Sequence, residues 1–268
     1  VERSRGLGDV YKRQDLNRSK ERRVTYSDGD AFDPTYINAT DIVYASTTDE
    51  IKESPFLNKN PDKDFPPSDL YMSDSFGAEI ARMSQQPGYD AEPIYVQNPV
   101  KPFIIFTSRR GDLMGIYRMD LKHTLVSLVS AEKGKDRRSP AVSPDGKDVA
   151  YVEKDLASGD LSLQLMNFKT KKATILKSGE GLYRDLSFAP RSPQRLFYSI
   201  LRKGEKQYQL EVYNVETKCT QVVFKGADSL FYPAVSNENQ ERLAFSRMFQ
   251  EHKQIYIVNL PPDLGPCI

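Results

Sequence analysis

The sequence has no tryptophan, two cysteines and two histidines among its 268 residues. So few cysteines exclude a small secreted scaffold that depends on several disulfides. The simplest interpretation of Cys219 and Cys267 is two unpaired thiols. One bridge between the carboxyl-terminal segment and the repeat before it is the alternative, and the sequence does not decide between them.

Motifs that carry catalysis are also missing. The chain contains no HExxH helix motif, no CxxC pair, no glycine-rich phosphate loop and no GxSxG nucleophile motif. His123 and His252 lie far apart in the sequence and are interpreted as surface residues. We therefore predict no catalytic residue, no metal site and no cofactor, and favour a non-catalytic protein over an enzyme. A calcium ion near Asp33, Asp90 and Glu92 is left open.

The chain carries no excess of either charge, with 38 Lys and Arg against 37 Asp and Glu. This balance argues against a nucleic-acid-binding surface and against a polybasic membrane surface. No apolar run approaches the roughly 18–20 residues that a membrane-spanning helix needs. The composition predicts a soluble globular monomer without a transmembrane segment.

The first 14 residues show neither strand nor helix periodicity and no signal-peptide pattern. We interpret residues 1–14 as a non-native, linker-derived segment and residues 15–268 as one domain. On this interpretation the missing signal peptide says nothing about the compartment.

A repeated strand pattern runs through that domain. Residues 139–152 give a short strand, a Pro144-Asp145-Gly146 turn and an alternating second strand. Proline presets φ, aspartate bonds to nearby backbone and glycine accepts a positive φ, so this turn joins two antiparallel strands.

The same frame recurs with markers at intervals of 59, 47, 45 and 48 residues, at Pro34, Pro93, Pro140, Asp185 and Pro233. Each interval holds a third strand rich in β-branched and aromatic residues, at 69–72, 115–119, 162–166, 210–213 and 254–258. Fourth strands are predicted at 80–84, 125–129, 173–176 and 220–224. Repeats of about 40–45 residues with four strands are typical of β-propeller blades. The predicted fold is therefore an all-β propeller of four-stranded antiparallel blades.

The first interval is lengthened by a polar insertion at residues 50–67, predicted to be a surface loop. A loop that contacts a partner is the alternative for this segment.

The number of blades follows from the two ends of the chain. The last repeat supplies three strands and then runs into Pro261 and Pro262, while residues 22–30 look like a fourth strand that leads into the next blade. Two arrangements fit: a six-bladed propeller with a truncated first blade, or a five-bladed ring closed by residues 22–27. We favour the six-bladed type, of which this chain shows about five blades.

The repeat resembles that of TolB-like propellers, on segments spread over roughly residues 20–260. They are the Ser-Pro-Asp-Gly turn at 143–146 with the flanking Pro140, and residues 42–47, 87–93 and 106–113. The resemblance implies a bacterial, periplasmic or secreted binding module that recognises a protein or peptide. The alternative is the propeller domain of a prolyl-oligopeptidase-like serine peptidase, or a propeller hydrolase or lyase.

Candidate binding residues lie where the chain enters the first strand of each blade. In propellers these positions converge on the mouth of the central channel. Here they mix acids, arginines and aromatic rings, which suits recognition of a polar peptide or small molecule. The residues are Phe32, Asp33, Asp90, Glu92, Arg137, Arg138, Tyr183, Arg184, Phe231 and Tyr232.

Overall fold

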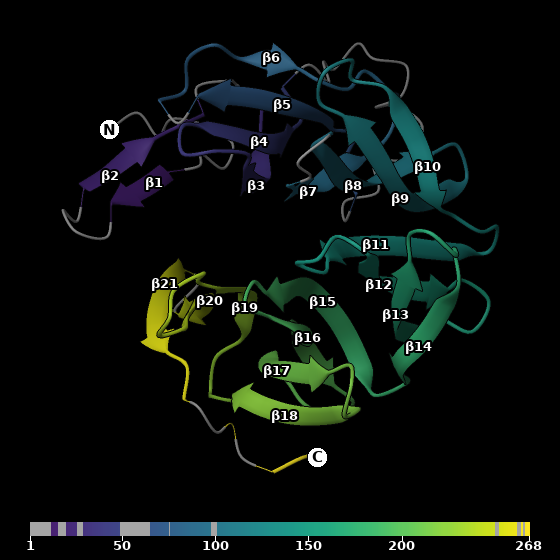
Figure 1. Cartoon of the computed structure of the whole chain (residues 1–268), viewed down its shortest axis with the longest axis vertical. Coiled ribbons are helices and arrows are strands. Elements are labelled where there is room, and N and C mark those ends of the chain that lie inside the picture. The colour runs from purple at the N-terminus through teal and green to yellow at the C-terminus, as the bar shows by residue number, and fades with distance from the viewer. Residues whose placement is uncertain are drawn as a thin grey trace, which may run out of the picture. The chain divides into compact units, whose positions relative to one another are not determined.

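The structure is a computed structural model that describes residues 12–15, 20–25, 29–48, 65–74, 76–97, 101–249, 252–261, 264 and 266–268. These residues form 21 strands, and no helix occurs among them (Figure 1). Every strand pairs with its neighbour in antiparallel fashion within the blades described below. The all-β prediction is confirmed.

The chain divides into two compact units, an amino-terminal unit (Val1–Lys133) and a carboxyl-terminal unit (Gly134–Ile268). The single domain over residues 15–268 stays a prediction. Of the segment 1–14 only residues 12–14 are described, and most of the insertion at 50–67 lies outside the described residues.

The amino-terminal unit contains a two-stranded hairpin and two four-stranded blades. The hairpin is β1 (Lys12–Asp15) with β2 (Lys20–Arg23). The first blade is β3 (Ala31–Tyr36), β4 (Asp41–Ser46), β5 (Asp69–Asp74) and β6 (Ala81–Arg82). The second blade is β7 (Asp90–Val96), β8 (Phe103–Arg110), β9 (Leu113–Asp120) and β10 (Val126–Ser130).

The carboxyl-terminal unit contains two four-stranded blades and a last blade with three strands among the described residues. The strands of the first are β11 (Lys135–Val142), β12 (Asp148–Asp155), β13 (Leu161–Asn167) and β14 (Ala173–Ser178). Those of the second are β15 (Gly181–Ala189), β16 (Ser192–Arg202), β17 (Gln209–Asn214) and β18 (Cys219–Phe224). The last blade is β19 (Leu230–Val235), β20 (Arg242–Phe249) and β21 (His252–Asn259).

The predicted Ser-Pro-Asp-Gly hairpin between β11 and β12 is confirmed. The Gly146 N–H donates to the Ser143 carbonyl at 2.8 Å, and Gly146 has a φ of 70°. The Ser143 hydroxyl donates to Asp145 at 2.7 Å and accepts from the Asp148 N–H at 3.0 Å. Lys147, which bonds to Asp145, and the Ser143 hydroxyl lower the pKa of Asp145 to about 2.

The first strand of every blade carries a bulge at the same place. Each bulge has one non-glycine residue with a φ of 51–55° and a shift in the pairing register beside it. The bulge residues are Asp33, Glu92, Ser139, Asp185 and Tyr232. Left-handed backbone is costly for such residues, so its recurrence shows that the surrounding pairing imposes it.

The bulges correct one repeat marker. In four blades a proline follows the bulge residue, whereas in the β15 blade Leu186 takes this place. The marker Asp185 is therefore one position too early, because that blade has no proline to align.

Buried aromatic rings of the second strands form the centre of each blade. They lie at equivalent positions, at Tyr44, Phe106, Tyr151, Tyr198 and Phe245. The third-strand residues paired with them are, in the same order, Tyr71, Tyr117, Gln164, Glu211 and Tyr256. Stacked or tilted ring pairs such as Tyr44 with Tyr71 favour the sheet, since cross-strand aromatic pairs add to burial.

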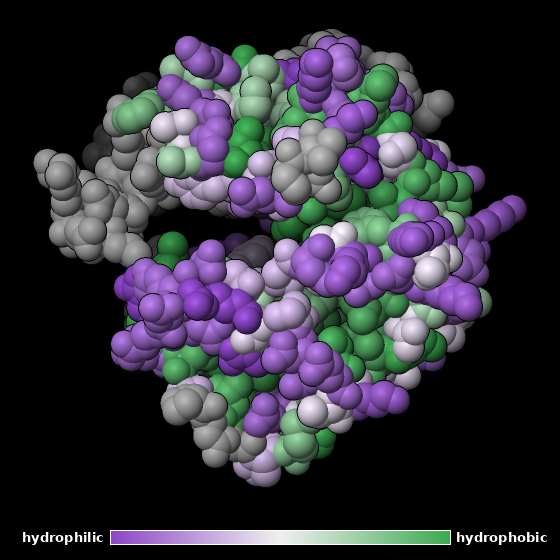
Figure 2. All heavy atoms as spheres, in the orientation of Figure 1, coloured by the Kyte–Doolittle hydropathy of each residue, from purple (hydrophilic) through white to green (hydrophobic). Residues whose placement is uncertain are grey.

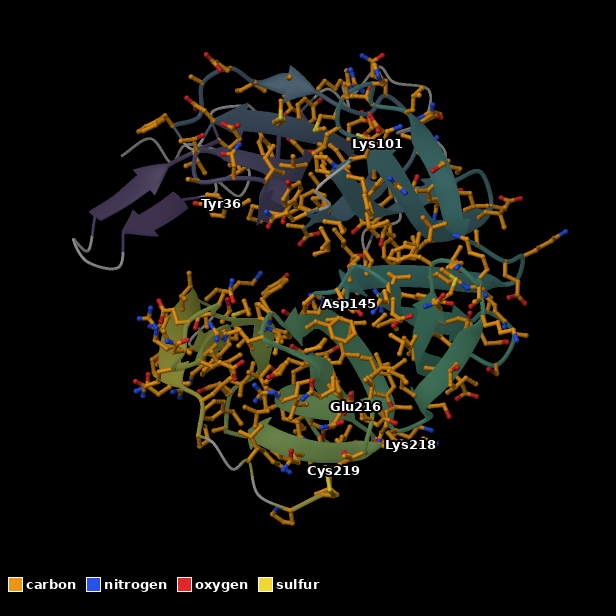
Figure 3. All side chains as sticks on the ribbon, viewed as in Figure 1. Tyr36, Lys101, Asp145, Glu216, Lys218 and Cys219 are labelled. Atoms are coloured by element: carbon orange, nitrogen blue, oxygen red, sulfur yellow. A yellow bond between two sulfur atoms is a disulfide. The ribbon has the colours of Figure 1, made fainter. Side chains whose placement is uncertain are left out.

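The interpretation of the two cysteines as unpaired thiols is wrong. Cys219 and Cys267 form a disulfide with their Cα atoms 5.3 Å apart (Figure 3). Beside it the Ile268 N–H donates to the Thr220 carbonyl at 2.8 Å. The sequence could not show this, because the bridge depends on the chain turning back from β21 to lie along β18.

Candidate functional site

All ten predicted site residues lie at the first-strand bulges or within two residues before them. Asp33, Glu92 and Tyr232 occupy the bulge itself. Phe32, Arg138, Arg184 and Phe231 precede it by one position, and Asp90, Arg137 and Tyr183 by two.

The three residues that lie two positions before a bulge are buried in their own blade or bonded to it. Tyr183 and Asp90 are buried, and Arg137 bonds to Glu153 of β12 at 2.8 Å. Burial raises the pKa of Asp90, while hydrogen bonds from serine hydroxyls and the Arg110 guanidinium, 3.9 Å away, oppose the shift.

In the amino-terminal unit Phe32 joins a group of aromatic rings. It stacks on Tyr89 at 6.5 Å between ring centroids, and Phe65 meets Tyr89 edge-on at 5.3 Å. The Arg109 guanidinium lies 5.1 Å from the centre of the Phe65 ring. At the neighbouring bulge the Thr107 hydroxyl donates to Glu92 at 2.5 Å. Asp33 is partly buried at its own bulge.

In the carboxyl-terminal unit the predicted residues Phe231 and Tyr232 come together around the cation of a third predicted residue, Arg184. The Arg184 guanidinium lies 5.0, 5.6 and 5.8 Å from the ring centres of Phe231, Tyr232 and Tyr208. The Lys253 ammonium lies 5.4 Å from the centre of the Tyr232 ring. We call these five residues, together with Asp185, the Arg184 cluster. The figure shows hydrophilic residues predominating on the visible face over β19–β21 (Figure 2).

Asp185 holds two members of the cluster through hydrogen bonds. Its carboxylate accepts from the Arg184 guanidinium at 3.1 Å and from the Tyr232 N–H at 3.2 Å. Burial raises the pKa of Asp185, and Arg184 opposes this shift. For Arg184 burial favours the neutral form, but Asp185 and the tyrosines outweigh it and raise the pKa. Arg184 is therefore a fixed cation with aromatic faces on several sides, which suits carboxylates and aromatic groups of a peptide.

Arg137 and Arg138 lie on β11, in the blade that precedes Arg184. Arg137 lies over the Tyr151 ring of its own blade at 5.6 Å, and Arg138 is partly buried on β11. The predicted set thus includes three residues of the Arg184 cluster and three that serve their own blade, while Phe32, Asp33, Glu92 and Arg138 belong to neither group.

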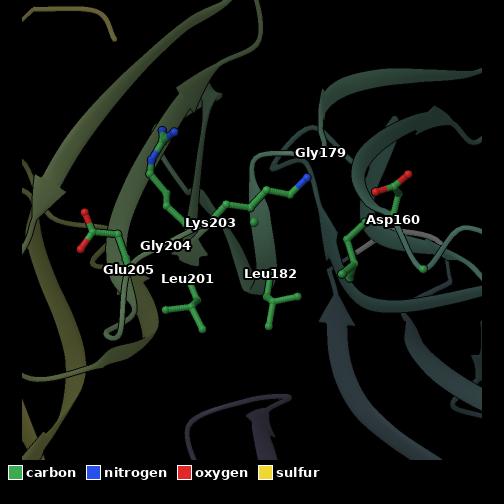
Figure 4. Close-up of a pocket in the computed structure, with 11 residues that line it drawn as sticks. Asp160, Gly179, Leu182, Leu201, Lys203, Gly204 and Glu205 are labelled. Carbon is green, nitrogen blue, oxygen red and sulfur yellow. The ribbon is translucent and has the colours of Figure 1, made fainter.

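A pocket of about 250 Å³ opens beside the start of β15. Its walls are residues 159–161, 179, 181–182 and 201–205, in two strand-connecting hairpins and around the start of β15. Leu182 pairs with Leu201 in the sheet register, and Asp160 and Glu205 lie at opposite sides with Lys203 between them (Figure 4). Arg202 is held at the wall by Glu211 at 2.7 Å and Glu180 at 3.2 Å.

Sequence reasoning missed several contributors to these groups. Tyr208 and Lys253 are not among the predicted site residues, and Asp185 enters the prediction only as a repeat marker. Tyr208 ends the hairpin before a third strand, and its carbonyl accepts from the Leu230 N–H of the next first strand at 3.0 Å. This hydrogen bond between two blades holds Tyr208 beside the first strand of the last blade, where Phe231 and Tyr232 lie.

Within the described residues no group of three or more His, Cys, Asp or Glu is arranged to hold a metal ion. No helix long and apolar enough to cross a membrane occurs in the same part of the chain.

Sequence comparisons give a short match. A scan against protein-family models finds none that fits the chain. The Tol-Pal system protein TolB of Francisella tularensis is 32% identical over 69 residues, which is 26% of this chain. That segment spans only 16% of the TolB protein.

Structural comparisons cover almost the whole chain. A putative TolB from Agrobacterium tumefaciens has a TM-score of 0.69 and 14% identity, covering 94% of this chain and 86% of that protein. An oligogalacturonate lyase in complex with manganese has a TM-score of 0.64 and 17% identity, covering 95% and 72%. The third structure is a prolyl endopeptidase with a TM-score of 0.51 and 14% identity, and the match covers 88% of this chain and 35% of that protein. At these identities the likeness shows the fold alone, a TolB-like β-propeller, as the repeat predicted.

Proposed function

We propose that this chain is a non-catalytic propeller module that binds a protein or peptide partner through the Arg184 cluster. The observation that carries the proposal is one cation between three aromatic rings, fixed by a buried carboxylate. Aromatic residues and arginine dominate the binding energy of protein interfaces, because they combine large contact area with directed polar groups.

The comparisons support this proposal and its location. The matched TolB of Francisella tularensis is a protein of the Tol-Pal system, and the resemblance of the repeat favours a place in the bacterial envelope. The Cys219–Cys267 bridge supports the same location, since disulfides persist in oxidising compartments such as the periplasm.

An enzyme is the alternative function, as the propeller of a serine peptidase or as a hydrolase or lyase. The structural likeness to an oligogalacturonate lyase and to prolyl endopeptidases favours testing it. Incubation of the purified chain with oligogalacturonate and with proline-containing peptides checks this directly. Product formation that survives repurification and rises with enzyme concentration would replace the binding proposal.

The binding proposal is tested with peptides selected from a random phage-displayed library on the immobilised chain. Fluorescence anisotropy then gives the dissociation constant of each synthetic peptide. We expect Arg184→Ala and Tyr232→Ala each to raise it at least about tenfold, because each removes a central contact. The Tyr232 side chain is exposed, so its loss leaves the fold intact.

Arg118→Ala is the matched control, since Arg118 also stacks on a ring, 3.9 Å from the centre of Phe103, outside the Arg184 cluster. Equal affinity of the selected peptides for all three variants and the unchanged chain would reject the Arg184 cluster as the site. Substituting Tyr183 or Arg137 is a poor test, because their burial and ion pairing make destabilisation the dominant effect.

A further inference from the structure

The pocket beside the start of β15 lies between two neighbouring blades of the carboxyl-terminal unit. It is lined by the hairpin between β12 and β13, the hairpin between β16 and β17, and the chain that joins β14 to β15. Leu161, at the pocket wall, packs in one core cluster with Tyr183 and Ile200 of the next blade. The pocket is therefore a fixed feature of the packing of these two blades, and it shares no residue with the Arg184 cluster.

One wall of the pocket is held by a chain of ion pairs. Arg202 lines the pocket and bonds to Glu211, which is fully buried, at 2.7 Å and to Glu180 at 3.2 Å. Glu180 also accepts from the Lys177 ammonium at 2.6 Å. Two positive and two negative charges compensate one another here, so this wall favours neither cations nor anions.

Two charged groups of the lining stay outside this network. The Asp160 carboxylate and the Lys203 ammonium make no hydrogen bond or salt bridge with any described residue. Glu205, in contrast, bonds to Lys225 at 2.8 Å. The Lys203 side chain extends toward the side of the pocket that carries Asp160 (Figure 4). The pocket therefore offers one negative and one positive group that do not pair with each other.

The rest of the lining is apolar or has no side chain. Leu182 and Leu201 lie side by side, since they are paired in the sheet register, and Leu182 is 45% exposed. At three of the four lining glycines a Cβ atom would meet nothing within 4 Å, so the space beside them is open. The four glycines are Gly159, Gly179, Gly181 and Gly204.

These features fit a free α-amino acid with an apolar side chain. Such a molecule carries an ammonium and a carboxylate on one carbon, which match Asp160 and Lys203. Its side chain would remove apolar surface of Leu182 and Leu201 from water. The volume of about 250 Å³ lies below the range of about 300–1,000 Å³ for drug-sized ligands, so the ligand is small. A phosphate or a metal ion fits less well, because it would meet a charge of its own sign.

We propose that this pocket binds a free zwitterionic α-amino acid with an apolar side chain. Lys203 holds its carboxylate, Asp160 holds its ammonium, and Leu182 and Leu201 contact its side chain. The site goes beyond the proposed function, because it takes a small molecule and is independent of a partner at the Arg184 cluster.

The experiment titrates the isotope-labelled full chain with L-leucine and follows the backbone amides by NMR. The amides of the four pocket glycines should shift and saturate with one dissociation constant, whereas those of Gly111 and Gly146, in other turns, should not shift. Three related compounds each lack one feature: N-acetyl-leucine the ammonium, leucinamide the carboxylate and glycine the apolar side chain. Each should bind at least about tenfold more weakly, because a charge-assisted hydrogen bond or an apolar contact is lost.

Variants assign the two charges. Lys203→Gln should weaken leucine binding about tenfold and leave leucinamide binding unchanged, because leucinamide has no carboxylate for Lys203 to hold. Asp160→Asn should weaken leucine binding equally and leave N-acetyl-leucine binding unchanged. The matched control is Lys172→Gln, in the turn between β13 and β14, which should change neither affinity. All three positions are exposed, so the exchanges leave the fold intact.

Three results would overturn the proposal. One is the absence of a saturating shift at the pocket glycines up to the solubility limit of leucine. The second is equal affinity for leucine, N-acetyl-leucine and leucinamide, which would mean that the two charges are not recognised. The third is an equal loss of leucine affinity in Lys172→Gln and Lys203→Gln, which would assign the effect to the overall charge of the chain.

Discussion

Two third strands of the same unit, β17 and β21, show opposite relations between polarity and burial. β17 buries the polar residues Gln209 and Glu211, whereas β21 exposes Ile255 and Ile257. Glu211 of β17 and Tyr256 of β21 hold the same register position, opposite Tyr198 and Phe245 respectively. Leu210 and Val212 of β17 are buried in one core cluster with Leu230, Leu243 and Phe245 of the following blade. The burial of a third strand is therefore set by the blade that packs on it, and buried polar residues are stabilised by pairing.

The buried acid in β17 is stable because three donors surround it. Glu211 accepts from the Tyr198 hydroxyl at 2.9 Å, the Arg202 guanidinium at 2.7 Å and the Gln209 amide at 2.6 Å. Arg202 in turn reaches Glu180 and the wall of the pocket. A charge without such partners would be costly at this depth.

Removing the disulfide should have the largest effect, because it links the end of the last blade to the complete blade before it. The bridge closes a loop over a separation of 48 residues. Chain-entropy arguments give about 4 kcal/mol for a loop of this size. We expect Cys267→Ser to lower the free energy of urea unfolding by up to this amount. Adding a reductant should lower the unchanged chain to the same value and leave the variant unaffected; an effect of reductant on the variant would contradict this assignment.

Glu211→Ala comes next and tests the pairing in β17. It leaves Arg202 and the Tyr198 hydroxyl without a buried acceptor, so we expect a loss of about 3 kcal/mol in unfolding free energy. The control is Glu205→Ala, whose salt bridge with Lys225 is exposed on both sides and should contribute less than about 1 kcal/mol.

A double-mutant cycle of Glu211→Gln with Tyr198→Phe isolates their hydrogen bond. The coupling should be about 1 kcal/mol. Additive losses would mean that Glu211 is held by Arg202 and Gln209 alone.

The turn between β11 and β12 should make the stability of the chain depend on pH, unlike the equivalent turn between β19 and β20. Lys147, through its bond to Asp145, and Ser143 lower the pKa of Asp145 to about 2 in the folded chain. A depressed carboxyl pKa contributes stability that is present above the unfolded value near 3.9 and is lost as the pH falls toward 2. The side chain is substantially exposed, so the contribution should stay below about 1 kcal/mol.

Asp145→Asn checks this prediction through urea midpoints measured between pH 2 and 5. The variant should lose part of the pH dependence in this range and match the unchanged chain near pH 2. In the last blade Ser236 makes the same hairpin bonds as Ser143, to Arg242 at 2.8 and 2.9 Å, but Asn237 and Glu238 replace the Pro-Asp pair. Asn237→Ala should therefore leave the pH dependence unchanged, and an equal change in both variants would contradict the assignment to Asp145.

The fold was predictable because strand alternation and turn chemistry are local properties of the sequence. The Pro144-Asp145-Gly146 turn and the strands around it follow from backbone preferences of neighbouring residues. The bulges could be predicted only in part. Prolines mark their positions in four blades, but the shift in register that creates each bulge depends on pairing with the second strand.

The candidate site was less predictable for the same reason. Arg184, Phe231 and Tyr232 were predicted because they lie on first strands, whereas Tyr208 lies in the turn before β17 and Lys253 on the third strand β21. Tyr183 is buried because side chains alternate between the two faces of the strand before the bulge. The marker Asp185 is one position too early, and this error hid the side of the strand on which Tyr183 lies.

The smallest effect on stability is expected where the comparison began, at the edge of β21. Ile255 occupies the position of buried Leu210 but is 68% exposed, so Ile255→Ser removes little apolar contact. We expect less than about 0.5 kcal/mol in urea unfolding, the usual range for an exposed site. Ile175→Ser, at 60% exposure in β14, is the matched control and should give the same small value. A loss above about 1 kcal/mol for Ile255 alone would show that other residues pack on its side chain in solution, as those of the following blade pack on Leu210.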